Sequence, residues 1–69
     1  MTEQEIRGLV DARNFINAWF RELPNHKTYE AAYESIEVIY EGYFNRRRYK
    51  DYGSFRVVKS RIIKTNGKK

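Results

Sequence analysis

Apolar residues recur every three or four positions along most of this chain, the spacing that places them on one face of a helix. The first such segment spans residues 3–23 and follows Thr2, whose spacing to Glu5 fits a capping box at a helix start. Gly8 weakens the first two turns by about 1 kcal/mol relative to alanine. Pro24 ends the segment, because its ring disfavours a helical conformation in the preceding residue. The apolar face comprises Ile6, Leu9, Val10, Ala12, Ile16, Trp19, Phe20 and Leu23.

The second amphipathic segment, residues 28–44, has the clearest helical periodicity, and Thr28 suits its N-cap. Its apolar face comprises Tyr29, Ala32, Tyr33, Ile36, Ile39, Tyr40, Tyr43 and Phe44. Glutamates at the same spacing form a stripe beside that face: Glu30, Glu34, Glu37 and Glu41. Because no loop carbonyls converge on this stripe, we expect a solvated acidic face rather than a cation site.

The third segment, residues 54–65, follows Gly53 and has Ser54 as its predicted N-cap. Its β-branched residues raise a strand alternative. A strand would mix core and charge on one face, however, whereas a helix places Phe55, Val58 and Ile62 together. We therefore expect a helix that ends near Lys64, with Asn66 and Gly67 as its stop signal.

These segments predict an all-α fold, a small three-helix bundle with helices at about residues 3–23, 28–44 and 54–65. The C-terminal helix is expected to be basic. Residues 1–64 are predicted to form a single helical domain, and residues 65–69 a flexible basic tail. Because the chain is short and contains no cysteine, its stability must come from apolar burial or from a partner subunit.

Catalysis is not expected from this sequence, and neither is a cofactor, a metal site or a small-molecule substrate. Its single histidine, His26, lies in a polar linker, and the glycines are isolated rather than grouped in a phosphate-binding loop. No apolar run approaches the length of a membrane span, and the acidic N-terminus lacks the order of a signal peptide. We therefore expect a cytoplasmic protein without a membrane partner.

Charge is distributed unevenly along the chain, and this asymmetry carries the main functional prediction. Residues 1–44 hold four Lys/Arg against eight Asp/Glu, whereas residues 45–69 hold ten Lys/Arg against Asp51 alone. A basic half of this kind suggests a polyanionic partner. We therefore predict a small nucleic-acid-binding module, a regulatory or accessory factor, with the choice between DNA and RNA left open.

The predicted interface combines the arginine run that follows the second segment with the outer face of the third. Arg56 and Lys59 are the candidates for base contacts, because they lie nearest the start of the last helix. Tyr49 is expected to be half exposed, where it either binds phosphate through its hydroxyl or stacks on an unpaired base. The remaining candidates, which include the phosphate contacts, are Arg46, Arg47, Arg48, Lys50, Ser60 and Lys64. Nine residues, Asn45 to Gly53, separate the last two helices, so the resemblance to helix-turn-helix proteins is only architectural.

Two other functions remain open at this point. The first is a protein-interaction module, a small adaptor or inhibitor of the kind that phages and mobile elements encode, which binds a larger protein or ribonucleoprotein through charged and aromatic surface. Its contact residues would be exposed aromatics such as Phe15, Trp19 and Tyr49, although Phe15 and Trp19 also suit the core. The second is a homodimer formed through the small residues Ala31, Ser35, Val38 and Gly42.

Overall fold

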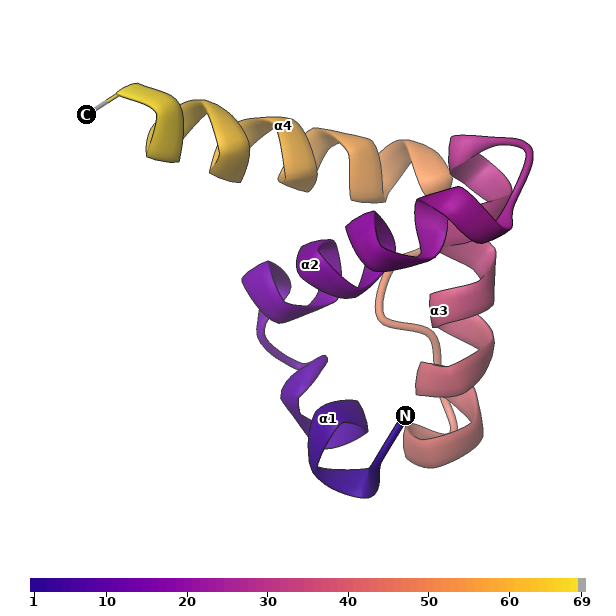
Figure 1. The fold of residues 1–69 in the computed structure, drawn as a ribbon. Helices are drawn as coiled ribbons and strands as arrows, with labels where there is room; N and C mark the ends of the chain where they lie inside the picture. The colour runs from indigo at the N-terminus through magenta and orange to yellow at the C-terminus, as the bar shows by residue number, and fades with distance from the viewer. Residues whose placement is uncertain (69) are drawn as a thin grey trace.

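The computed structural model describes the backbone of residues 1–68 and the side chains of residues 1–64. The elements are α1 (Glu3–Gly8), α2 (Ala12–Glu22), the short 3-10 helix η1 (Leu23–Asn25), α3 (Tyr29–Phe44) and α4 (Tyr52–Lys68) (Figure 1). No strand occurs within residues 1–68, so the all-α prediction is confirmed and the strand alternative for the last segment is wrong. Residues 1–68 form four α-helices where the pattern predicted three.

The additional helix arises from a break at the point where the first predicted helix was weakest. Asp11 has extended backbone angles, φ −78° and ψ 127°, and its carboxylate accepts the N–H of Arg13 at 2.8 Å. Asp11 is thus the N-cap of α2. The Nδ2 of Asn14 donates to the carbonyl of Gly8 at 3.0 Å, which satisfies a carbonyl at the end of α1. The prediction of one helix over residues 3–23 is therefore wrong.

The break changes which side chains of this region are buried. Val10 and Phe20, both predicted to be core residues, are 53 % and 47 % exposed. Phe15 and Trp19, whose role the sequence left open, are 0 % and 3 % exposed. The helical wheel that predicted the apolar face assumes a constant rotation per residue from residue 3 to residue 23. The turn at Asp11 interrupts that rotation, so the wheel assigns the wrong face to some residues.

The core is built largely from aromatic side chains that meet around Phe15. The ring of Phe15 lies 6.1 Å from that of Tyr33, 5.2 Å from Tyr49 and 5.5 Å from Phe55, measured between centroids. Each such pair adds about 0.5–1.5 kcal/mol beyond the burial of its area. The buried hydrophobic residues are Leu9, Phe15, Ile16, Ala18, Trp19, Ala32, Tyr33, Ile36, Tyr40, Tyr49 and Phe55.

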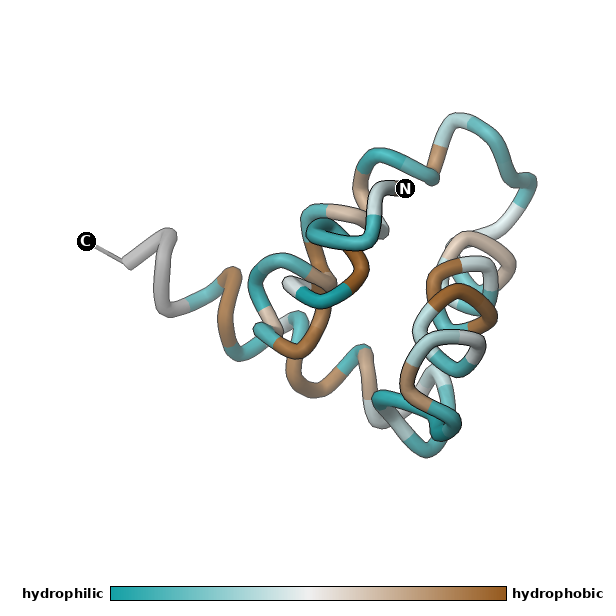
Figure 2. Tube along the Cα trace, turned by 90° about the horizontal axis from the view of Figure 1, so that it is seen from below, coloured by the Kyte–Doolittle hydropathy of each residue, from teal (hydrophilic) through white to brown (hydrophobic). Residues whose placement is uncertain are grey.

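The helices enclose this core from three sides, and α4 lies at the edge of the molecule. In Figure 1, α4 runs beside α2 in the opposite direction, while α3 descends along one side and α1 lies below. The connection between α3 and α4, residues 45–51, climbs from the lower end of α3 to the start of α4. Figure 2 shows hydrophobic and hydrophilic residues alternating along each helix, as amphipathic helices require.

The last helix is longer than predicted at both ends. Its first turn is capped by Asp51, whose carboxylate accepts the N–H of Ser54 at 2.9 Å, so the prediction of Ser54 as the N-cap is wrong. The α4 backbone continues to Lys68, beyond the predicted stop at Asn66 and Gly67. The division into a domain of residues 1–64 and a flexible tail of residues 65–69 stays a prediction, and residue 69 lies outside the described residues.

Within the described part of the chain, no helix has the length and apolar character needed to cross a membrane.

Candidate functional site

The connection between α3 and α4 carries the arginine run, and it begins with a residue in the left-handed region. Asn45 has φ 64° and ψ 28°, and its N–H donates to the carbonyl of Glu41 at 2.8 Å. Asparagine tolerates this conformation better than most residues. The chain therefore reverses at Asn45 and returns past α3 (Figure 1), where Arg47 and Arg48 bond to residues of that helix.

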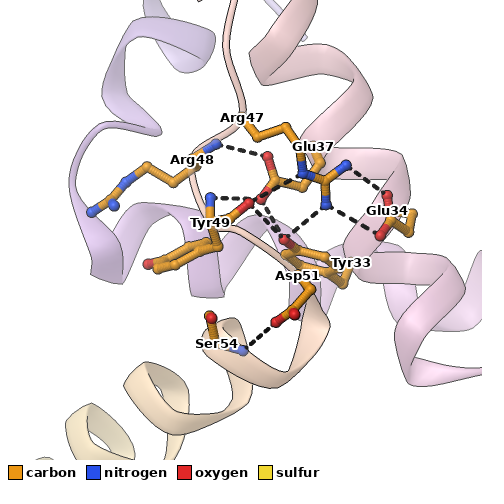
Figure 3. Close-up of polar contacts among 8 residues, drawn as sticks. All are labelled: Tyr33, Glu34, Glu37, Arg47, Arg48, Tyr49, Asp51 and Ser54. Carbon is orange, nitrogen blue, oxygen red and sulfur yellow. Dashed lines mark hydrogen bonds and ion pairs between the residues drawn. The ribbon is translucent and has the colours of Figure 1, made fainter.

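A buried carboxylate on α3 holds this returning segment in place (Figure 3). Glu37, at 0 % exposure, accepts the backbone N–H groups of Arg48 and Tyr49, each at 2.9 Å. It also accepts the hydroxyl of Tyr33 at 2.5 Å. The prediction that Glu37 belongs to a solvated acidic face is therefore wrong, because its oxygens satisfy donors of the connection.

Arg47 is exposed, but its guanidinium bonds to side chains of α3. Its guanidinium donates to both carboxylate oxygens of Glu34 at 3.3 Å and to the hydroxyl of Tyr33 at 3.2 Å. Its Nε donates to the carbonyl of Tyr49 at 3.1 Å. Burial, and after it the hydrogen bond to Glu37, raises the pKa of Tyr33, so this tyrosine stays protonated. Four of its five N–H donors bond within the protein, which favours a structural role, and the phosphate contact predicted for Arg47 stays a prediction.

Arg48 and Tyr49 are also parts of the folded framework. Tyr49 is 8 % exposed, so the expectation that it is half exposed is wrong, and its ring cannot stack on a base. The guanidinium carbon of Arg48 lies 4.7 Å from the centre of that ring. Within the described residues, Arg48 Nε and the Tyr49 hydroxyl are buried without a hydrogen-bond partner. Burial raises the pKa of Tyr49.

Apart from Arg47, the predicted residues that are exposed to solvent divide into two groups. Arg56, Ser60 and Lys64 are exposed on α4 at a spacing of four residues, so they share one face. We call these three residues the α4 stripe. At 1.5 Å per residue it spans about 12 Å along the helix axis. Arg46 and Lys50 are exposed on the connection, near its α3 end and its α4 end respectively.

Lys59, which was predicted to contact a base, is turned toward α2. Its ammonium lies 5.1 Å from the centre of the Trp19 ring, and the side chain is only partly exposed. The cation therefore covers the buried indole. Of the two proposed base contacts, only Arg56 belongs to the exposed face of α4.

The outer face of α4 also includes residues that the sequence analysis did not single out. Val57 is 56 % exposed and adjoins the α4 stripe. Together with Gly53, Arg56 and Ser60 it lines a shallow, open hollow of about 420 Å³. Two helical positions after buried Phe55, Val57 falls on the outer face of α4, so the helical periodicity of the sequence could have predicted its exposure.

The residues considered for catalysis or metal binding form no metal site in the described part of the chain. The Nε2 of His26 lies 3.2 Å from the Oε1 of Glu22, one helical turn away. His26 lies in the linker before α3, as expected, and is a partly buried partner of Glu22. Within residues 1–68, no group of three or more His, Cys, Asp or Glu side chains is placed to hold a metal ion.

Comparison with protein-family models, with curated proteins and with solved structures found no match for this chain. No family is therefore assigned, and its function has to follow from the residues themselves.

Proposed function

We propose that this protein binds nucleic acid through the exposed face of α4. The α4 stripe is the observation that carries the proposal, because Arg56 and Lys64 face solvent about two turns apart with the hydroxyl of Ser60 between them. A helix at the edge of the molecule can approach a phosphate backbone without interference from the other helices (Figure 1).

The distribution of charge over the fold supports the same proposal. Exposed carboxylates lie on the other helices and include Glu3 on α1 and Glu30 and Glu41 on α3. The acidic residue nearest α4 is Asp51, and its carboxylate accepts an N–H at the start of that helix. A polyanion is therefore attracted to α4 and the adjoining connection and repelled by α1 and α3.

The roles within the interface differ from those predicted by sequence. Arg56 and Lys64 bind phosphates, and Arg46 and Lys50 add exposed positive charge along the connection. Arg47, Arg48 and Tyr49 shape the connection and do not contact the ligand. A variant that changes all three arginines at once would disturb folding, so it cannot serve to test binding.

The test is a titration of labelled nucleic acids at about 50 and about 200 mM salt. The variant Arg56→Gln/Lys64→Gln is compared with Arg21→Gln/Lys27→Gln, which removes the same charge from exposed positions elsewhere. The α4 variant should bind at least about tenfold more weakly. The slope of its log affinity against log salt concentration should fall by the amount expected for about two lost phosphate contacts. Equal weakening in both variants would mean that only total charge matters.

A second candidate function, protein interaction, is favoured by a groove between α2 and α4. This groove, about 360 Å³ in volume, is lined by Arg13, Ile16, Asn17, Phe20, Ile62 and Ile63. Phe20 is 47 % exposed and Ile63 is 40 % exposed, whereas the aromatics first considered as contacts are buried. The combination of apolar lining with Arg13 suits an apolar segment flanked by acidic residues. An acidic amphipathic peptide should then bind the wild type more tightly than Phe20→Ala, and equal affinities would reject the groove.

Self-association remains the third proposal. Ala31, Val38 and Gly42 are exposed on α3, and a Cβ added at Gly42 would meet no atom within 4 Å. Sedimentation at about 50 μM, a concentration at which micromolar association is visible, should show a dimer if this face is used.

A further inference from the structure

Proteins that bind single-stranded nucleic acids combine a positively charged groove with aromatic rings on which successive bases stack. The two aromatic residues of α4, Tyr52 and Phe55, are turned toward the core, where their ring centroids lie 5.6 Å and 4.9 Å from that of Tyr33. The basic face of α4 therefore offers no stacking platform among the described residues.

The exposed aromatic rings lie elsewhere. Tyr29 and Tyr43 belong to α3, and the hydroxyl of Tyr43 donates to Glu3 at 2.9 Å. Phe20 faces the groove between α2 and α4. A single strand that followed the cations of α4 would leave its bases without partners, which disfavours both single-stranded DNA and unpaired RNA.

A double helix meets the geometry of α4 better. The major groove of B-form DNA, about 12 Å wide, admits an α-helix, whereas the major groove of A-form RNA is too narrow for side chains to read. The helix α4 lies at the edge of the molecule and extends past α2 in Figure 1, so its outer face is free to enter a groove.

The residues on that face suit the floor and the walls of a major groove. Arg56 and Lys64 stand at the two ends of the α4 stripe, where they reach the phosphates on either side. Between them Ser60 is small, and Val57 is an apolar side chain exposed in an otherwise polar region. An apolar side chain in this position matches the thymine methyl, which projects only into the major groove.

We infer that the nucleic acid is double-stranded DNA, and that α4 lies in its major groove with Val57 against the base edges. This inference rests on the function proposed above. It adds the class of nucleic acid, the groove and a residue that contacts a base.

The experiment compares a mixed-sequence DNA duplex of about 20 base pairs with double-stranded RNA and single-stranded DNA of the same sequence, at about 200 mM salt. We expect the DNA duplex to bind at least about tenfold more tightly than either competitor. Equal or tighter binding of RNA or of single strands would overturn this inference and leave the proposed function intact. Absence of binding to all three would reject both.

A second arm tests the groove directly. Replacing thymine by deoxyuridine removes only the methyl groups of the major groove and should weaken wild-type binding about threefold. In Val57→Ala the two duplexes should bind equally, and this variant should fold because Val57 is exposed. A wild type that does not distinguish the two duplexes would overturn the placement of α4 in the major groove.

Discussion

Replacing Glu37 by alanine should remove most of the stability of this protein, although the sequence pattern assigned the side chain to an acidic helix face. The carboxylate is fully buried and accepts two backbone N–H groups and one hydroxyl. In the alanine variant, the hydroxyl of Tyr33 can turn to the carbonyl of Tyr49, which lies 3.5 Å away. The N–H groups of Arg48 and Tyr49 have no such substitute within the described contacts.

Each buried donor left without an acceptor costs about 1–3 kcal/mol. Two such donors therefore cost about 2–6 kcal/mol, and a chain of this size is stabilised by only about 3–5 kcal/mol. We expect the Glu37→Ala variant to be mostly unfolded at room temperature.

Urea denaturation measures this effect, with the fluorescence of the single tryptophan, Trp19, as the probe of packing and circular dichroism as the probe of helix. Glu41→Ala is the matched control, because Glu41 is exposed on the same helix. It should change the free energy of unfolding by less than about 0.5 kcal/mol. If Glu37→Ala stays within about 1 kcal/mol of the wild type, the carboxylate does not hold the connection.

Three further predictions concern the core, the break after α1 and the start of α4. Phe15→Ala should lower the free energy of unfolding by about 3–5 kcal/mol and unfold the protein, because Phe15 is fully buried. Phe20→Ala, in the same helix but exposed, should stay folded as measured by circular dichroism. Similar melting of the two variants would contradict the assigned core. Asp11→Ala removes the N-cap of α2 and should lower the free energy of unfolding by about 1 kcal/mol in urea, and an unchanged midpoint would argue for a continuous helix. The N–H of Ser54 holds the pKa of Asp51 below its ordinary value, so the stability that Asp51 contributes is present above about pH 4 and lost as the pH falls through the lowered pKa. The thermal midpoint of Asp51→Asn should therefore fall less steeply than that of the wild type as the pH is lowered below about 4. Equal slopes in the two proteins would exclude this contribution.

Local signals along the sequence predicted several interactions within one helical turn, although the caps at Asp11 and Asp51 were missed. The capping box of Thr2 and Glu5 is present, with hydrogen bonds of 3.0 Å and 3.2 Å. Thr28 caps α3 by accepting the N–H of Ala31 at 3.0 Å, and α2 ends at Glu22, just before Pro24. These interactions join residues at fixed short spacings, so the pattern of residue types predicts them.

Most of the errors in the candidate site come from interactions between residues that are distant in the sequence. Glu37 satisfies N–H groups of Arg48 and Tyr49, and nothing in helical spacing indicates that the chain returns to meet it. For the same reason Arg47 looked like one of three equivalent cations, although it forms an ion pair with Glu34 on α3. The composition of the basic half predicted a charged surface. Tertiary packing determined which of its cations face solvent.

The most direct measurement of the central claim is a map of amide NMR chemical shifts as a DNA duplex is added to the labelled protein. We predict that the largest changes occur along the outer face of α4, from Gly53 to Lys64, with smaller changes at Lys50 and little change in α1 and α3. Changes centred on Phe20 and Ile63 would favour the groove between α2 and α4 instead. A spectrum that does not change, or changes spread evenly over all exposed cations, would contradict the account.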